Sequence, residues 1–220
     1  MLRALVSQMR VFSLLLLAAF AAQAQETISV LERREVPLER RATPAAHELR
    51  LTLALLDGSG WTPETILAAV QESAGILVQC GVRMENAELV RIGAPDRFRD
   101  FHTPTSRELA RAVPLAKPTL YFVAGTRQRP AFDAEAIGRG NSRTRPELAD
   151  TVWVTRATRD LGIALTHELA HVLMDSGAHS DEPGNLMRED TAPENTRLSD
   201  RQCARLRETG SINGLLAPLR

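Results

Sequence analysis

The chain has 220 residues, of which 44% are hydrophobic, and its 27 basic residues balance 27 acidic ones. This length suits one domain with a hydrophobic core and is short for two. The basic residues are scattered along the chain rather than gathered into a patch or stripe, so the charge pattern argues against a nucleic-acid partner.

The first 24 residues have the pattern of an export signal. Arg3 and Arg10 precede an apolar run over residues 11–20, and Ala22-Gln23-Ala24 supplies the small residues that signal peptidase recognises. Because the run is too short to cross a bilayer, we expect cleavage before Gln25 and an exported product, either secreted or periplasmic. The alternative is an N-terminal membrane anchor that is retained. No later stretch is long and apolar enough for a membrane helix, so the mature protein is not expected to insert into a membrane.

The mature chain is expected to form one domain, residues 47–220, preceded by an extended lead-in segment at residues 25–46. The lead-in is charged and shows no sustained hydrophobic period. Removing the signal takes Arg3 and Arg10 from the 27 basic residues, which leaves 25 against 27 acidic residues and a net charge of −2.

Short runs rich in Leu, Ile and Val, bounded by turn residues, predict the strands of this domain. They cover residues 47–55, 82–92, 118–124, 131–137 and 151–155. The fourth of these has the weakest pattern. Tyr121, the only tyrosine, falls on the third and is expected in the core rather than in catalysis.

Apolar residues at helical spacing predict helices at residues 62–79, 106–112, 159–175 and 199–210. Thr62 and Pro63 begin the first helix, since Pro is favoured at the first helical position. Ser199 and Gln202 form a capping box at the start of the last helix. This order of elements favours an α/β or α+β fold, in which helices pack on a mixed sheet.

Cys80 and Cys203 are the two cysteines of the chain. In an exported protein a single disulfide between them is the simplest interpretation. It would close a long loop and stabilise the fold by about 3–5 kcal/mol. The alternative is two separate buried thiols.

His167, Glu168 and His171 form the most informative pattern in the chain. Two histidines four residues apart project from one face of a helix, about 6 Å apart along its axis, so both can bind one ion. Zinc accepts neutral imidazoles as ligands. Glu168 can reach a metal-bound water without binding the metal, which is the position of a general base. The alternative is that both histidines are structural and that Glu168 lies on a solvated face.

A third metal ligand is expected shortly after this helix. His179 stands twelve residues after the first histidine and Asp175 stands eight after it, while Gly177 can end the helix in a left-handed turn that brings the chain back toward the ion. We favour His179, because imidazole suits zinc and Asp175 can instead accept a hydrogen bond from a ligand imidazole. A surface histidine is the alternative for His179. His47 and His102 have no ligand-like neighbours and are expected to be structural.

Residues 167–187 resemble the metzincin branch of zinc metallopeptidases, which join a helical His-Glu-x-x-His to a Gly-ended turn, a third His and a turn that carries a Met. The matching pieces are His167, Glu168, His171, Gly177, His179 and Asn185-Leu186-Met187. The family has Gly seven residues and the third His ten residues after the first His. This chain has Met174 and Gly177 at those positions, so the turn is expected nearly one helical turn later.

The resemblance implies a zincin-like fold, with a twisted mixed sheet packed on an active-site helix and a second long helix, and with a small C-terminal helical subdomain. It also implies that Met187 forms a hydrophobic floor beneath the metal ligands without binding the metal, whereas an ordinary core Met is the alternative. By the same analogy the substrate peptide would lie along an exposed edge strand near residues 132–137, with residues 138–142 as a rim loop.

These features predict an exported zinc metalloendopeptidase with Zn²⁺ as its cofactor and a polypeptide as its substrate. The expected reaction is peptide hydrolysis by a zinc-activated water, with Glu168 as the general base. Two alternatives keep the same residues. One is a zinc-binding module without turnover, and the other is a zinc amidase that acts on a cell-wall crosslink.

Overall fold

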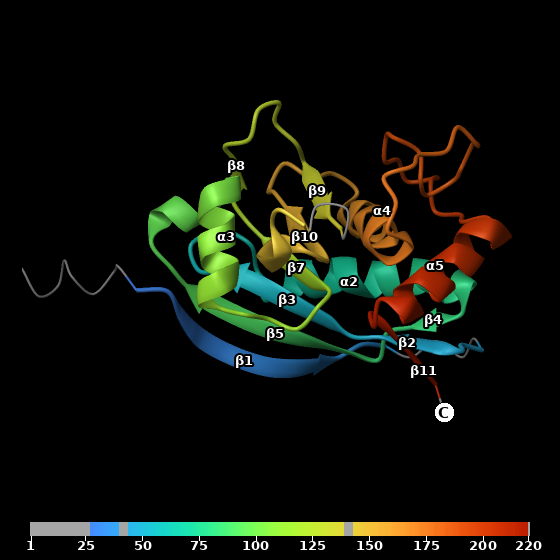
Figure 1. The fold of residues 1–220 in the computed structure, drawn as a ribbon, viewed down its shortest axis with the longest axis horizontal. Coiled ribbons are helices and arrows are strands. Elements are labelled where there is room, and N and C mark those ends of the chain that lie inside the picture. Colours follow the sequence, from blue (N-terminus) through green and yellow to red (C-terminus); the bar gives the residue numbers. More distant parts are fainter. Residues whose placement is uncertain (1–26, 40–43, 139–142, 220) are drawn as a thin grey trace, which may run out of the picture.

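A computed structural model describes residues 27–39, 44–138 and 143–219 of the chain (Figure 1). The predicted export signal and its cleavage site lie outside the described residues, and so does most of the predicted rim loop. No helix in these ranges is long and apolar enough to cross a membrane.

A six-stranded mixed sheet forms the centre of the fold, with the strand order β1-β5-β3-β7-β10-β9. Its four inner strands are parallel, and the two edge strands run antiparallel to their neighbours. The strands are β1 Ser29–Pro37, β3 Leu51–Leu56, β5 Asn86–Gly93, β7 Thr119–Phe122, β9 Ala134–Ile137 and β10 Thr151–Val154. All residues of β3, β7 and β10 are buried, as expected for parallel strands covered on both faces.

Two smaller sheets contain the remaining strands of the described residues. One has the order β11-β2-β4, and the other pairs β6 with β8. Their strands are β2 His47–Leu49, β4 Val82–Arg83, β6 Asp100–Phe101, β8 Gly125–Thr126 and β11 Leu216–Pro218. The predicted strands at residues 47–55 and 82–92 are therefore each divided between the large sheet and the first small one.

Helices cover both faces of the large sheet (Figure 1). They are α2 Pro63–Leu77, α3 Thr103–Ala112, α4 Leu161–Met174 and α5 Asp200–Ile212, with the short 3₁₀ helix η1 Val78–Cys80 after α2. One hydrophobic cluster joins α2, α4 and α5 to one face, whereas α3 belongs to a second cluster on the other face. The predicted combination of a mixed sheet, an active-site helix, a second long helix and a C-terminal helix is confirmed.

The predicted helix starts follow from the capping chemistry. Thr62 Oγ1 accepts a hydrogen bond from the amide of Thr65 at the start of α2, with Pro63 at the first helical position. Ser199 and Gln202 form the capping box of α5. Tyr121 is buried in the core, where its ring stacks on that of Trp153, so its predicted structural role is confirmed.

The predicted disulfide between Cys80 and Cys203 is confirmed, with a Cα–Cα distance of 4.8 Å. It joins η1, at the end of α2, to the first half of α5. Both sulfur-bearing residues are buried within the cluster that also contains α4. The disulfide therefore ties the C-terminal helix to the layer of helices that carries the histidine motif.

Part of the predicted lead-in segment forms β1, an edge strand paired with β5. Most of its side chains are exposed, and Arg33 forms an ion pair with Glu88 of β5 at 2.9 Å. Because β1 packs so few of its side chains into the core, it lacks the alternation of apolar and polar residues that marks a strand in a sequence.

Candidate metal centre

Helix α4 and the loop that follows it bring three histidines together. His167 and His171 lie one turn apart on α4, and His179 lies in the loop after the helix. One ligand nitrogen from each lies within 4.8 Å of the others. Among the described residues this is the group of side chains that can hold a metal ion, and neither His47 nor His102 belongs to it.

The hydrogen bonds of two of these rings show which nitrogens face the centre. His167 Nδ1 lies 2.7 Å from the carbonyl oxygen of Leu186, and His171 Nδ1 lies 2.6 Å from that of Ser176. A carbonyl oxygen can only accept, so both Nδ1 atoms carry the hydrogen. In the neutral rings both Nε2 atoms are then bare acceptors.

The two Nε2 atoms face each other at 2.9 Å. Two lone pairs this close repel unless a proton or a metal ion lies between them. Tetrahedral zinc, with bonds of about 2.0–2.1 Å, would hold two ligand nitrogens about 3.3 Å apart, so a small outward movement of the rings accommodates it. Burial lowers the pKa of His167, and burial together with the neighbouring His167 lowers the pKa of His171 to about 4. Both rings are thus neutral at physiological pH, as metal ligands must be.

The end of α4 differs from the sequence prediction. The helix ends at Met174, and Asp175 takes the left-handed conformation, with φ 45° and ψ 54°. The prediction that Gly177 makes this turn is wrong, since Gly177 is not among the positive-φ residues. Asp tolerates the left-handed region better than most residues. The chain therefore turns two residues earlier than predicted, and Ser176 is placed to accept the hydrogen bond of His171.

The two candidates for the third ligand, His179 and Asp175, lie in different places relative to His167 and His171. His179 joins the other two histidines, and its ring centroid lies 5.0 Å from that of His171 and 5.4 Å from that of His167. Asp175 does not belong to this group of ligand atoms, but it lines a cavity that His171 and His179 also line.

A turn at Asn185-Leu186-Met187 holds the ring of His167 by a hydrogen bond. Leu186 provides the carbonyl that accepts from His167, and Met187 is buried at 1% exposure. The backbone amide of Met187 donates to Asn185 Oδ1 at 2.9 Å, and its carbonyl accepts from the amide of Ser180. The predicted turn is thus connected both to a histidine ring and to the loop that carries His179.

Asn185 is itself held by Gln202 through a pair of amide hydrogen bonds. Asn185 Nδ2 donates to Gln202 Oε1 at 3.0 Å, and Gln202 Nε2 donates to Asn185 Oδ1 at 3.1 Å. Sequence reasoning placed Gln202 only in the capping box of α5. Its second contact could not be found by spacing, since seventeen residues separate the partners. Helix α5 is therefore linked by hydrogen bonds to the ring of His167.

Glu168 lies between the histidines of α4 in the sequence and faces the edge strand β9. Burial and the nearby carboxylate of Glu135 raise the pKa of Glu168 to about 7, while a hydrogen bond with the backbone of Ala136 acts in the opposite direction. A carboxylate with a pKa near neutrality can take up and release a proton during a reaction. Glu135 lies on β9, and sequence reasoning did not identify it.

A cleft of about 400 Å³ contains these groups, and we call it the histidine cleft. Its walls are the end of α4 and its loop on one side and β9 on the other, with Glu168, His171 and His179 among the lining residues. Strand β9 is the last strand of the sheet, so the predicted position of an edge strand beside the site is confirmed.

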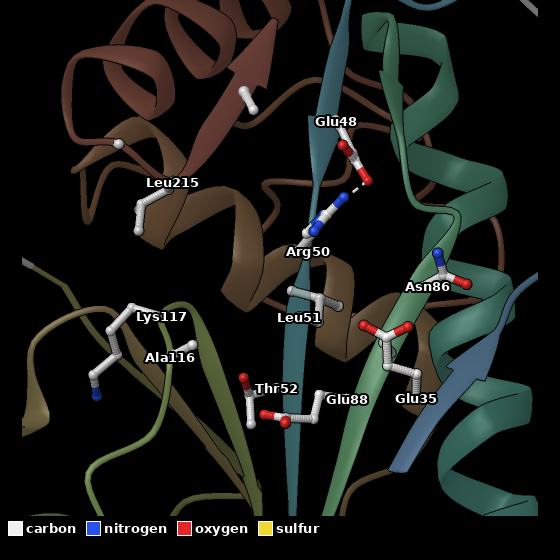
Figure 2. A pocket seen from close by; sticks show the side chains of 13 residues that line it. Glu35, Glu48, Arg50, Leu51, Thr52, Asn86, Glu88, Ala116, Lys117 and Leu215 are labelled. Carbon is white, nitrogen blue, oxygen red and sulfur yellow. Dashed lines mark hydrogen bonds and ion pairs between the residues drawn. The ribbon is translucent and has the colours of Figure 1, made fainter. Parts of the chain in front are cut away.

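A larger hollow, of about 590 Å³, lies at the other end of the sheet (Figure 2). It is lined by the starts of β3 and β5 and by the segment before β7. Two of its three glutamates pair with arginines, since Glu48 pairs with Arg50 at 2.9 Å and Glu88 pairs with Arg33. This larger hollow contains no histidine or cysteine and offers no comparable metal site.

Comparison with known proteins adds a likeness in fold. No protein-family model matches the chain, and neither does any curated protein. Metalloproteinase-II from Bacteroides fragilis is similar in structure, with a TM-score of 0.51 and 18% sequence identity over 80% of this chain and 57% of that protein. The fold is zincin-like. The chain spans about half the length of that metalloproteinase, so the likeness concerns the fold alone.

Archaemetzincin from Methanopyrus kandleri also matches, with a TM-score of 0.48 and 15% identity over 74% of this chain and 96% of that protein.

Proposed function

We propose that this protein is an exported zinc-dependent endopeptidase, in which His167, His171 and His179 hold the zinc ion and Glu168 is the general base. The observation that carries the proposal is the pair of bare Nε2 atoms that face each other at 2.9 Å beside a cleft lined by Glu168. Such a pair is suited to a cation, and the carboxylate next to it is suited to proton transfer.

A zinc ion bound there would polarise the scissile carbonyl and acidify a water. The residues of the chain transfer the proton and orient the metal ligands. Glu168 takes a proton from the attacking water while the water oxygen bonds to the carbonyl carbon. The same carboxyl then gives the proton to the leaving amine nitrogen as the C–N bond breaks. The carbonyls of Leu186 and Ser176 keep the rings of His167 and His171 oriented throughout.

Strand β9 supplies a binding edge for a polypeptide substrate. Its other edge pairs with β10, and the side that faces α4 borders the histidine cleft through residues Ala134 to Gly138. An extended peptide can add to such an edge by backbone hydrogen bonds, which places its amide groups next to Glu168. The disulfide between Cys80 and Cys203 supports export, since disulfides persist in oxidising compartments.

The proposal is tested with the mature protein, residues 25–220, and the variant Glu168→Gln. We expect wild type to hydrolyse denatured casein and quenched peptides, and expect the variant to lose about 10²–10⁴-fold in kcat/KM. Metal analysis should find zinc in both proteins, because Glu168 is not a ligand. The exposed Glu208 on α5 provides a matched control, since Glu208→Gln should keep wild-type kcat/KM.

Three other outcomes would contradict the proposed base, the peptidase activity or the substrate class. Full activity of Glu168→Gln would rule out the proposed base. Wild type that holds zinc but cleaves no peptide would indicate a binding module. Release of peptides from purified sacculi without cleavage of casein would indicate a cell-wall amidase.

A further inference from the structure

A second cavity, of about 440 Å³, adjoins the histidine cleft, with Glu168 and Ala134 lining both. We call it the acidic pocket, after the carboxylates of Asp133, Asp160, Glu189 and Asp190 in its lining. We propose that the acidic pocket binds the cationic side chain of a substrate Lys or Arg that follows the scissile bond. This inference rests on the proposed function, and it adds a substrate class.

The position of the acidic pocket follows from its walls. The residues before and at the start of β9 form one wall, the first turns of α4 form the second, and the loop after Met187 forms the third. The histidine cleft continues from Ala134 along β9 to Gly138. A substrate that extends along β9 with its scissile bond at Glu168 therefore places a neighbouring side chain at the acidic pocket.

The direction of the substrate determines which neighbour this is. Antiparallel pairing with β9 is favoured, because antiparallel ladders are slightly more stable than parallel ones. A peptide antiparallel to β9 enters at the Gly138 end and leaves at the Asp133 end, so the residue that reaches the acidic pocket lies on the C-terminal side of the cleaved bond. Cleavage should then occur before a basic residue.

The charges of the acidic pocket are unbalanced within the protein. In the parts of the chain that the structure describes, the four carboxylates of the acidic pocket other than Glu168 take part in no ion pair and no side-chain hydrogen bond. Asp160 precedes α4 but does not cap it with its side chain. Arg159 is the single basic residue of the lining.

Several acidic side chains elsewhere on the surface have basic partners. Glu147 pairs with Arg107, Glu108 pairs with Arg97, and Glu88 pairs with Arg33. Four like charges around one cavity repel one another and create a negative potential, which a bound cation relieves. The acidic pocket thus has the electrostatic properties of a cation-binding subsite next to the reaction centre.

The walls of the acidic pocket are held by backbone contacts that leave the carboxylates free. The carbonyl of Asp133 accepts from the amide of Thr155 at 3.0 Å and from the hydroxyl of Thr158. The carbonyl of Asp190 accepts from Asn195 Nδ2 at 3.0 Å. Anchored walls lose little freedom when a ligand binds, which favours selectivity.

The test uses quenched peptides that differ only in the residue after the cleaved bond, which is Arg, Lys, Gln or Glu. We expect wild type to cleave the Arg and Lys peptides on the order of 10–100 times better in kcat/KM than the Gln peptide, and the Glu peptide least. The ratio should decrease as salt rises from about 0.05 to about 0.5 M, because exposed charges are screened.

The variants Asp160→Asn and Glu189→Gln, singly and combined, should bring the Arg-to-Gln ratio toward one. Glu208→Gln removes an exposed carboxylate outside the acidic pocket and should keep the wild-type ratio. The ratio compares two substrates of the same enzyme sample, so a partial loss of folding in a variant does not affect it.

Binding to zinc-loaded Glu168→Gln gives a second readout that does not require turnover. Fluorescence anisotropy of labelled peptides should give a Kd for the Arg peptide at least about tenfold lower than for the Gln peptide. An active wild type with equal kcat/KM for Arg, Gln and Glu peptides would overturn this inference and leave the proposed function intact. If no peptide is hydrolysed, the proposed function fails, and equal Kd values would then also reject the cationic subsite.

Discussion

The larger hollow in Figure 2 and the histidine cleft border the same sheet, yet their polar groups are arranged in opposite ways. In the larger hollow, Glu48 pairs with Arg50, and Glu88 pairs with Arg33. In the histidine cleft, the Nε2 atoms of His167 and His171 face each other without a cation, and Glu168 lies next to a second carboxylate.

The size of a hollow is therefore a poor guide to reactivity in this molecule. Paired charges already satisfy each other, so they stabilise a surface and have little left for a ligand. A fold that holds like charges or bare lone pairs close together raises the free energy of the folded protein. A bound ligand of the opposite charge lowers that free energy. Substitutions in three parts of the molecule test this contrast.

The largest effect is expected from His179→Ala compared with Asp175→Ala. If the three histidines form the centre, His179→Ala should lower the zinc affinity more than a hundredfold, beyond the roughly 10–100-fold typical of residues that only support a ligand. Asp175→Ala should lower it by less than about tenfold, because Asp175 lines the cleft without joining the group. Competition with a chromophoric chelator measures both affinities. A greater loss for Asp175→Ala would make the carboxylate the ligand.

An intermediate effect is expected from Gln202→Met. This change removes the amide pair with Asn185 and so loosens the turn whose Leu186 carbonyl orients His167. Zinc affinity should fall about 10–100-fold. Ser199→Ala is the matched control, since it weakens the same capping box and costs about 1 kcal/mol of stability but leaves the amide pair in place. Equal zinc affinity in the two variants would show that Gln202 acts on stability alone.

The smallest effect is expected in the wall of the larger hollow, from Lys117→Met. Burial lowers the pKa of Lys117 to about 8, and the carboxylate of Asp150 opposes this shift. Between pH 8 and its unfolded value of about 10.4, the folded amine has lost its proton while the unfolded amine keeps it, so wild-type stability should rise with pH in this window. Below pH 8 the folded protein carries the full cost of a buried charge.

Lys117→Met removes that cost. At pH 7 we expect a gain on the order of 1 kcal/mol in the free energy of unfolding, well below the full conversion of the pKa shift, because the side chain is only partly buried and its amine donates to the carbonyl of Glu147. Urea unfolding at pH 7 and pH 9.5 measures the difference, which should shrink at the higher pH. A Lys117→Met variant less stable than wild type at pH 7 would show that the amine contributes a net attractive contact.

The part of the site that depends on local spacing could be predicted from the sequence. His167, Glu168 and His171 lie within two turns of one helix, and the helical repeat alone determines which of them share a face. The capping box at Ser199 and Gln202 depends on local spacing in the same way.

Three features of the structure are not marked by local spacing in the sequence. The end of α4 depended on Asp175 taking a left-handed conformation, which sequence reasoning assigned to Gly177. Strand β1 is charged and exposed, so its place in the sheet comes from backbone pairing with β5 and not from a hydrophobic pattern. The acidic pocket combines carboxylates from segments that the chain separates by tens of residues.

Local spacing and rare residue types were enough to predict the helical histidine motif, the pair of cysteines and the order of most strands and helices. The folded chain was needed to show that His179 and not Asp175 lies with the two helical histidines, which carbonyls orient the rings, and which carboxylates lie near Glu168. Those relations arise from the packing of distant segments, and their geometry follows from the whole fold rather than from any local repeat.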